Sequence, residues 1–391
     1  MSAPEFALRI DLPLPALAER WRALEARAAP RFFLSWTWIG AWLETLGSVP
    51  PVLEGHIDGQ TVLLGVVVPR HRAEAGLIRV HGAMLHTTGA RAQDVIAVEY
   101  NGFLVDRAHA GAIEATAVAF LLGPARLAGR RCDELHIVAA PAEAEARLIP
   151  PGMLVQRPAR KPSWRVDLEA VRTAGEFPAL LSANTRQQLR RALRGYAARG
   201  PLAATPAADA ATALGWLDAL AALHQAQWQA RGEPGGFAFP FFARFQRRLV
   251  AGGVAEARVE LLRMTAGDDT LGYLLNLIEG DHVMAFVSGF RLDRDPRLKP
   301  GLVCHALAIA RHAAAGRAVY DFLAGAARYK ASLGRPGPEF AYLLIQRPTP
   351  MTRAEHALRR LLRRPAARDQ TGGDQAIEAS TGASAASRAA G

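Results

Sequence analysis

The hydrophobic positions of the first 150 residues alternate between helical and strand spacing. Ser35 precedes a stretch in which Trp38, Ile39 and Trp42 recur every three or four residues, which predicts a helix capped by the serine. Asp58-Gly59 lies between two apolar runs and predicts a hairpin. The elements expected in this half are helices at Leu14–Ala28 and Gly111–Leu122, and strands at Val52–Ile57, Thr61–Arg70 and Glu134–Ala139.

The second half has a clearer order of elements. Ser182 precedes a helix that carries Leu189, Leu193 and Tyr196 on one face, and Gly200 ends it. The helices expected here are Arg186–Arg199, Ala208–Ala230, Phe241–Ala251, Leu302–Ala315 and Ala327–Leu333. The strands expected are Ala257–Thr265, Leu271–Glu279, His282–Phe290, Ala318–Leu323 and Phe340–Gln346.

The length of 391 residues favours two domains, and mixed helices and strands favour an α/β or α+β fold. The helix- and strand-breaking sequence Pro150-Pro151-Gly152 predicts a domain boundary, which gives domains at 1–150 and 151–348. The remainder, 349–391, is expected to form a basic amphipathic helix at Thr352–Arg364 and a disordered tail from Arg368.

The chain is basic, with a net charge of +11. This excess suits anionic partners such as nucleic acid, anionic lipid or a phosphate-bearing small molecule, or it reflects an arginine-rich composition. Only two cysteines, Cys132 and Cys304, are present, so neither a disulfide framework nor a cysteine-based metal site is expected. We expect no membrane-spanning segment and no signal peptide, and cytoplasm is the simplest location.

A candidate anion site precedes the helix expected at Leu302–Ala315. The sequence Lys299-Pro300-Gly301-Leu302 places a positive charge, a proline without an N–H and a glycine at the start of this helix. The unpaired N–H groups of a helix N-terminus hold pyrophosphate well. The alternative is an ordinary helix start.

Polar residues at the end of the strand Ala318–Leu323 form a second candidate site. Asp321 lies in an apolar strand, and Tyr329-Lys330 follows its carboxyl end, where α/β sheets bind ligands. Lys330 would stabilise a developing oxyanion, and Tyr329 would either protonate a leaving thiolate or position the acceptor. The alternative is a structural ion pair between Asp321 and Lys330.

Two helices supply further candidates. His224 and Trp228 share one helical face, where the histidine is either a general base or a structural residue. Arg186, Arg190 and Arg194 form a stripe that either grips phosphates or faces solvent. Hydrolase, zinc-protease and nucleotide-binding motifs such as GxSxG, HExxH and GxxxxGK[ST] are absent from the sequence.

These segments occur in an order that resembles the GNAT-superfamily acyltransferases of the CelD-like or BioF-like type, which are related to the FemAB aminoacyltransferases. The resemblance covers about residues 6–347. The matching segments begin at Phe33, Ser182, Leu223, Pro300 and Tyr320, and the last is followed by Tyr329-Lys330.

The resemblance implies two GNAT-like domains in tandem, each a mixed sheet flanked by helices, with the second more complete. It implies acyl-CoA, most simply acetyl-CoA, as donor, an amine as acceptor, no metal, and a link to exopolysaccharide or cellulose synthesis. Lys330, Tyr329, Asp321 and His224 are the expected catalytic residues. Lys299, Pro300, Gly301 and Leu302 would hold the donor, and Arg186, Arg190 and Trp228 would contact the acceptor.

One departure from the family and two alternatives remain. The loop before the helix has one glycine, Gly301, where the GNAT phosphate loop is glycine-rich. A FemAB-like transfer from aminoacyl-tRNA is the first alternative. The second is a non-catalytic module of a polysaccharide assembly, in which the basic tail helix touches a membrane or a partner.

Overall fold

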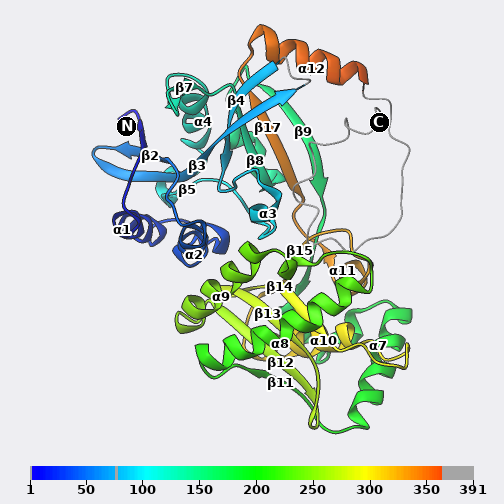
Figure 1. Ribbon diagram of the computed structural model, residues 1–391. Helices are drawn as coiled ribbons and strands as arrows, with labels where there is room; N and C mark the ends of the chain where they lie inside the picture. Colours follow the sequence, from blue (N-terminus) through cyan, green and yellow to red (C-terminus); the bar gives the residue numbers. More distant parts are fainter. Residues whose placement is uncertain (1, 75–77, 363–391) are drawn as a thin grey trace. The chain divides into compact units, whose positions relative to one another are not determined.

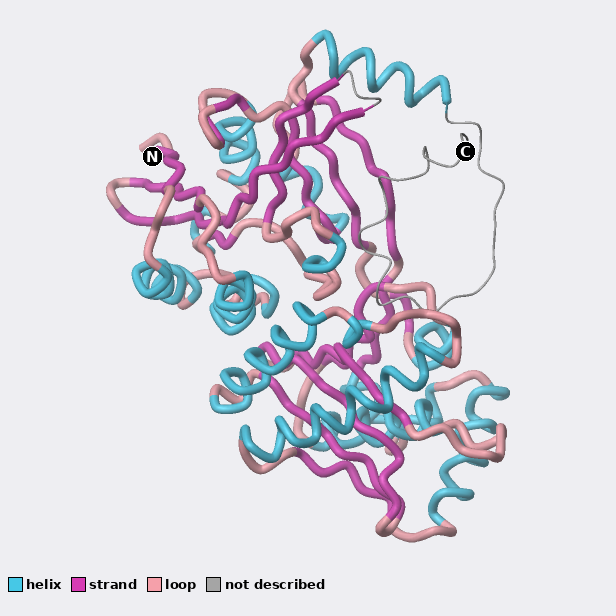
Figure 2. The backbone as a smooth tube through the Cα atoms, viewed as in Figure 1, coloured by secondary structure: helices cyan, strands magenta, loops and turns pink. Residues whose placement is uncertain are grey.

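The computed structural model describes residues 2–74 and 78–362 of the chain, which divide into two compact units. Of the described residues, the first unit comprises those up to 161 and those from 338 to 362, and the second comprises 162–337. Each unit contains a mixed sheet flanked by helices, as Figures 1 and 2 show. The mixed α/β architecture predicted from the sequence is therefore confirmed.

The sheet of the first unit has the order β1-β2-β3-β4-β8-β17-β9, with β5 pairing beside β3. Every neighbouring pair on this path is antiparallel except β4 and β8. Figure 1 shows the orange strand β17 between β8 and β9, although it comes from the end of the chain. The strands are β1 (Glu5–Arg9), β2 (Val52–Ile57), β3 (Gln60–Glu74), β4 (Ile78–Leu85), β5 (Leu104–Val105), β8 (Glu134–Pro141), β9 (Leu154–Lys161) and β17 (Phe340–Gln346).

Helices and an aromatic cluster complete the first unit. The predicted serine cap is present, because the Ser35 side chain accepts a hydrogen bond from the N–H of Trp38 at the start of α2. Trp21, Trp38 and Trp42 are fully buried. The helices are α1 (Leu14–Glu25), α2 (Trp36–Leu46), α3 (Arg91–Asp94), α4 (Glu114–Leu122), α5 (Glu145–Leu148) and α12 (Pro350–Leu362), and a small separate ribbon joins β6 (Arg126–Leu127) to β7 (Arg130–Arg131).

The sheet of the second unit has the order β11-β12-β13-β14-β15-β10-β16. Here too, every neighbouring pair is antiparallel except one, β14 and β15. The strands are β10 (Ser163–Asp167), β11 (Leu202–Pro206), β12 (Val259–Ala266), β13 (Asp269–Glu279), β14 (His282–Phe290), β15 (Val319–Ala324) and β16 (Arg335–Pro336).

Helices cover both faces of this second sheet (Figure 2). α6, α7 and α10 pack on one face around a core that includes Tyr196, Val303 and Tyr320. α8 and α9 contact β12, β13 and β14. The helices are α6 (Leu168–Ala174), α7 (Ala183–Ala197), α8 (Ala210–Gln229), α9 (Pro240–Ala255), α10 (Pro300–Ala314) and α11 (Arg328–Leu333), with the short 3-10 helix η4 (Phe177–Leu180).

The two sheets share one plan of strand pairing. Four antiparallel strands are followed by a fifth that runs parallel to the fourth, and then by two more antiparallel neighbours. In the second unit the helix α10 connects the fourth strand to the fifth, and in the first unit the longer connection between these strands includes the helix α4 together with α3, β5, β6 and β7. The chain is therefore built from two copies of the same architecture.

The structure divides the chain differently from the predicted boundaries at 150 and 348. The segment 154–161 follows the predicted boundary and was assigned to the second domain, but it forms the edge strand β9 of the first unit, where Pro158 is tolerated. The strand Phe340–Gln346 was assigned to the second domain, but it pairs with β8 and β9 in the first. Hydrophobic periodicity reports that a strand exists and carries no information about its distant partner.

The helix expected at Thr352–Arg364 corresponds to α12. Thr352 and Glu355 are buried within the first unit, and the Glu355 carboxylate accepts a hydrogen bond from Gln346 of β17. This part of the helix therefore packs on its own domain. The tail predicted to be disordered lies outside the described residues. Within the described part of the chain, no helix has the length and hydrophobicity required to cross a membrane.

Candidate functional site

The parallel strands β14 and β15 pair only at their beginnings. His282, Val283 and Met284 lie opposite Val319, Tyr320 and Asp321, although β14 continues to Phe290 and β15 to Ala324. A shift of register near Ala285–Val287 marks a bulge in β14. Leu323 in β15 has a left-handed backbone with φ of 62°, which is costly for a leucine and typical of functional sites. The two strands therefore separate toward their carboxyl ends.

The N-terminus of α10 lies between these strands in the chain and has no side-chain cap. The N–H of Val303 bonds to the carbonyl of Lys299, whereas those of Gly301 and Leu302 have no acceptor among the described residues. A Cβ added to Gly301 would lie 3.1 Å from the ring of Phe290, so a glycine suits this close approach. With the exposed Lys299, this helix start offers open donors and positive charge to an anion.

A buried histidine occupies the interior where the strands separate. His305 of α10 has aromatic neighbours from both strands and from α11: Phe290, Tyr320, Phe322 and Tyr329. Its Nδ1 lies 3.0 Å from the Tyr320 hydroxyl, and its Nε2 is buried with no partner among the described residues. Burial, with a smaller effect of the Lys330 charge, lowers the pKa of His305 to about 3, so its ring is neutral.

Tyr329 and Lys330 lie beside this histidine. The Tyr329 ring stacks on the His305 ring, with centroids 5.5 Å apart and planes 17° from parallel. The Lys330 ammonium donates to the carbonyl oxygen of Ala324 at 2.7 Å, which fixes it at the carboxyl end of β15. Two residues predicted as catalytic therefore share one site with the open end of α10 and with His305.

His305 was not predicted from the sequence, although its helical position contained a signal. Leu302, His305, Ile309 and His312 recur at intervals of three and four residues, which places both histidines on the apolar stripe of the helix. A polar ring on a buried stripe requires a partner or a function. His312 has its partner in Glu260, at 3.1 Å, whereas Nε2 of His305 has none in the described structure.

Asp321 lies elsewhere in the sheet. Its neighbours Tyr320 and Phe322 point toward α10, so alternation along the strand directs Asp321 to the opposite face. Its carboxylate lies 3.0 Å from Nε2 of His282 and accepts the N–H of Leu323 at 2.7 Å. This geometry favours a structural role, in which Asp321 joins β15 to the first residue of β14 and supports the turn at Leu323.

His224 also has the contacts of a structural residue. Its Nδ1 lies 3.0 Å from the carbonyl oxygen of Ser288 in β14, and its Nε2 accepts a hydrogen bond from the N–H of Gly236 at 3.4 Å. Burial lowers its pKa. Trp228 is buried beside it, with Arg231 over its ring. Because both ring nitrogens of His224 have hydrogen-bond partners, neither is available to accept a proton as a general base. The Trp228 side chain is buried, which favours a packing role over the predicted contact with the acceptor.

The predicted arginine stripe of α7 does not act as one unit. Arg186 donates to the carbonyl oxygen of Leu181, and the exposed Arg190 pairs with Glu176. Two other arginines pair with carboxylates of the loop before α10. Arg199 pairs with Asp293 at 2.7 Å, and Arg297 lowers the pKa of Asp295 to about 2 through hydrogen bonds. The negative charges of Asp293 and Asp295 are thus balanced by arginines, so they repel an anion near Lys299 less strongly.

The corresponding helix of the first unit has a different N-terminus. Glu114 occupies the first turn of α4, where its carboxylate accepts the N–H of Gly111 at 2.8 Å and lies 3.3 Å from Arg147. A buried carboxylate at this position repels an anionic ligand. The open helix start is therefore a property of the second unit. Across the described residues, no group of three or more His, Cys, Asp or Glu side chains is arranged to hold a metal ion.

Comparison with known proteins agrees with this geometry. Residues 183–331, from α7 to α11, match the family model of the acetyltransferase (GNAT) domain. FemX superposes with a TM-score of 0.56 at 9% identity, covering 87% of this chain and 98% of its own. The C-terminal domain of a lysylphosphatidylglycerol synthetase from Agrobacterium fabrum gives 0.52 at 11% identity, covering 89% and 95%. L-PGS from Bacillus licheniformis gives 0.51 at 10% identity, covering 88% and 97%.

Identities this low establish the fold alone. The superpositions extend over both units, and the two sheets share one plan of strand pairing. The fold expected from the resemblance, two mixed sheets flanked by helices in tandem GNAT-like domains, is thereby confirmed, and FemX has a similar fold. No curated protein sequence matches the chain significantly.

Proposed function

We propose that this chain transfers an acyl group from a CoA thioester to an amine within its second unit, because residues 183–331 match the family model of the acetyltransferase (GNAT) domain. The single observation that carries the proposal is the separation of β14 from β15, with the open start of α10 at one side and His305, Tyr329 and Lys330 beside it. The acetyl group is the simplest acyl group for this domain.

The residues at the start of α10 fit the phosphates of such a donor. The N–H groups of Gly301 and Leu302 are open, Lys299 adds a full positive charge, and Gly301 leaves room for close approach. A loop with one glycine could therefore bind the phosphates, because two N–H groups and one ammonium would take the place of the N–H groups of a glycine-rich loop. CoA would supply the activated thioester carbonyl.

The side chains beside the separated strands suit the chemistry at that carbonyl. The acceptor nitrogen, as the free amine, forms a bond to the carbonyl carbon and the carbon–sulfur bond breaks. The proton lost by the nitrogen passes through solvent and replaces the proton that Tyr329 gives to the departing sulfur. Lys330 would offset charge on the carbonyl oxygen, and the Nε2–H of neutral His305 would donate to the same oxygen. Tyr329, held by stacking on His305, would protonate the departing thiolate.

The direct test combines a donor panel with variants of Lys330. Native mass spectrometry of the purified chain with a series of acyl-CoA esters measures which donor binds. Lys330→Met, which removes the ammonium and keeps the length of the side chain, should lower kcat by about 10²-fold without changing the melting temperature greatly. Lys330→Arg should restore part of the rate. Full activity of Lys330→Met would refute the assignment.

Transfer from aminoacyl-tRNA is the second candidate. It is favoured by the fold shared with FemX and with lysylphosphatidylglycerol synthetases, and by the arginines of α7 and the following loops. Binding of charged tRNA that weakens steeply with salt, together with no binding of CoA esters, would establish this alternative.

The biological setting rests on the resemblance alone. A role in exopolysaccharide or cellulose synthesis, in the cytoplasm, would require an amine acceptor that is a sugar or a sugar-linked compound, and this acceptor is an alternative to a small-molecule amine. A non-catalytic module would bind neither CoA esters nor charged tRNA, so the same binding panel separates it from both enzymes. Release of free CoA thiol in the presence of candidate amino sugars is the corresponding activity assay.

A further inference from the structure

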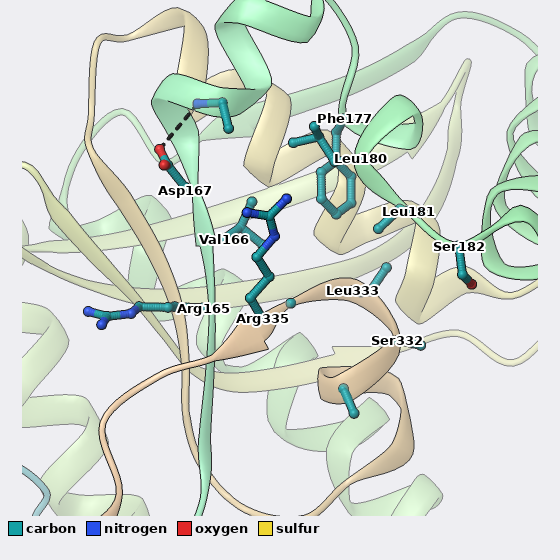
Figure 3. A pocket seen from close by; sticks show the side chains of 13 residues that line it. Arg165, Val166, Asp167, Phe177, Leu180, Leu181, Ser182, Ser332, Leu333 and Arg335 are labelled. Atoms are coloured by element: carbon teal, nitrogen blue, oxygen red, sulfur yellow. Dashed lines mark hydrogen bonds between the residues drawn. The ribbon is translucent and has the colours of Figure 1, made fainter.

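The second unit contains a small pocket beside α11. Its volume is about 170 Å³, and it lies between β10, η4 and the turn from α11 to β16. A cavity of about 150 Å³ holds a benzene molecule, so this pocket has room for a group of that size. The apolar part of its wall consists of Val166, Phe177, Leu180, Leu181 and Leu333 (Figure 3).

The polar side chains of the pocket differ in whether they have partners. Ser332 donates to the carbonyl of Tyr329, Ser182 donates to Thr185, and Asp167 accepts the N–H groups of Glu169 and Ala170. In contrast, neither Arg165 nor Arg335 makes a side-chain hydrogen bond or ion pair within 2–74 and 78–362. The pocket therefore offers unpaired positive charge next to an apolar wall.

The two arginines are directed differently, although their backbones pair directly in the sheet. Figure 3 shows the Arg335 guanidinium extending toward Val166 and Phe177, whereas the Arg165 side chain points away from them. The Arg165 side chain instead runs past Gly337, whose added Cβ would lie 3.5 Å from the Cγ atom of the arginine. Arg335 is thus positioned to bind an anion held in the pocket, and Arg165 provides a matched control.

The pocket is close to the residues proposed for acyl transfer. Ser332 and Leu333 line it and belong to α11, which also carries Tyr329 and Lys330. Four residues along a helix correspond to about 6 Å, so Tyr329 lies about one turn from Leu333. A molecule that fills the pocket therefore lies about one helical turn from Tyr329.

We propose that this pocket binds the acyl acceptor, and that the acceptor is a small amine carrying a carboxylate and a benzene-sized apolar group, as in an apolar α-amino acid. The apolar group fills the space beside Phe177 and Leu333, and Arg335 binds the carboxylate through its planar guanidinium. The role of this molecule as acyl acceptor rests on the proposed acyltransferase function. Its binding to the pocket, through the carboxylate and the apolar group, does not depend on that function.

The test uses three probes with the full chain. Phenylalanine carries both groups, phenethylamine lacks the carboxylate, and glycine lacks the apolar group. Binding is measured by calorimetry, and transfer by release of CoA thiol from acetyl-CoA. Arg335→Ala should weaken phenylalanine binding by about 10- to 100-fold, the effect of a hydrogen-bonded charge pair, and leave phenethylamine unchanged. Arg165→Ala should change either affinity less than about twofold.

Each contrary outcome has a distinct meaning. Equal binding of phenylalanine by wild type and Arg335→Ala, or an equal loss in Arg165→Ala, overturns the site. Stronger competition by phenyl phosphate than by phenylacetate overturns the carboxylate assignment in favour of a phosphate-bearing acceptor. If phenylalanine binds through Arg335 but acetyl-CoA does not bind to the wild type, the proposed acyltransferase function fails while the pocket stands.

Discussion

His305 and Tyr320 share a hydrogen bond of 3.0 Å between the imidazole Nδ1 and the phenol oxygen inside the second unit. Burial raises the pKa of the tyrosine well above its usual value and lowers that of the histidine to about 3. Both groups therefore remain neutral near pH 7. If the phenol donates to Nδ1, the imidazole proton resides on Nε2, the nitrogen that has no partner among the described residues.

Tyr320→Phe tests this tautomer. Loss of the hydroxyl removes the group that selects the Nε2–H form, so kcat should fall about tenfold while KM for acetyl-CoA changes little. Two-bond proton–nitrogen correlation spectra of the imidazole should show the Nε2–H tautomer in the wild type and a mixture in the variant. A wild type that carries the proton on Nδ1 would rule out the donor role of His305.

Acid should destabilise the chain through His305. Its folded pKa, about 3, lies below its ordinary value of 6.5, so between these limits the unfolded state binds the extra proton. The stabilising contribution of the neutral ring is complete above pH 6.5 and decreases as the pH falls toward 3, by up to about 1.4 kcal/mol per pH unit. Denaturant unfolding of the wild type and of His305→Gln between pH 4 and 7 measures this, and the variant should show the shallower dependence.

Lys299→Ala should weaken donor binding. Removal of one charge beside the open N–H groups of α10 should raise the Kd for acetyl-CoA by about three- to tenfold and reduce its salt dependence. Arg244→Ala provides the control, because this exposed arginine lies on α9, which packs on the other face of the sheet. Isothermal titration calorimetry of acetyl-CoA with both variants measures the two Kd values. A similar loss of affinity in the two variants would indicate a general effect of net charge and contradict the prediction.

His224→Phe should affect stability and spare catalysis. The substitution leaves the carbonyl of Ser288 and the N–H of Gly236 without their partner, at a cost of about 1–3 kcal/mol in the free energy of unfolding. Well below the melting temperature, kcat should remain within about twofold of the wild type. A general base would instead lower kcat by about 10²-fold or more, and that result would restore the catalytic role expected from the sequence.

Local structure could largely be predicted from the sequence. The helices α7, α8, α9 and α10 begin and end within a few residues of the expected bounds, because apolar spacing, caps and terminal glycines act locally. The short strands β1, β10 and β11 were not predicted, since strands of five residues with half-exposed side chains give little periodic signal.

The candidate site could be predicted only in part, for a similar reason. Tyr329 and Lys330 were expected just beyond the carboxyl end of β15, and the Lys330 ammonium bonds to the carbonyl oxygen of Ala324 there. Asp321 was assigned to the same site because it is close in sequence, but alternation directs it to the other face of the strand. The contact between His305 and Tyr329 depends on how α10 and α11 pack, which no local pattern records.

The position of β17 has a consequence for biosynthesis. The sheet of the first unit needs this strand between β8 and β9, yet it is synthesised after the whole second unit. The strands of the second sheet all lie between Ser163 and Pro336, so they have left the ribosome before Phe340. We therefore expect the second unit to complete its folding first. The sheet of the first unit remains incomplete until β17 has been synthesised.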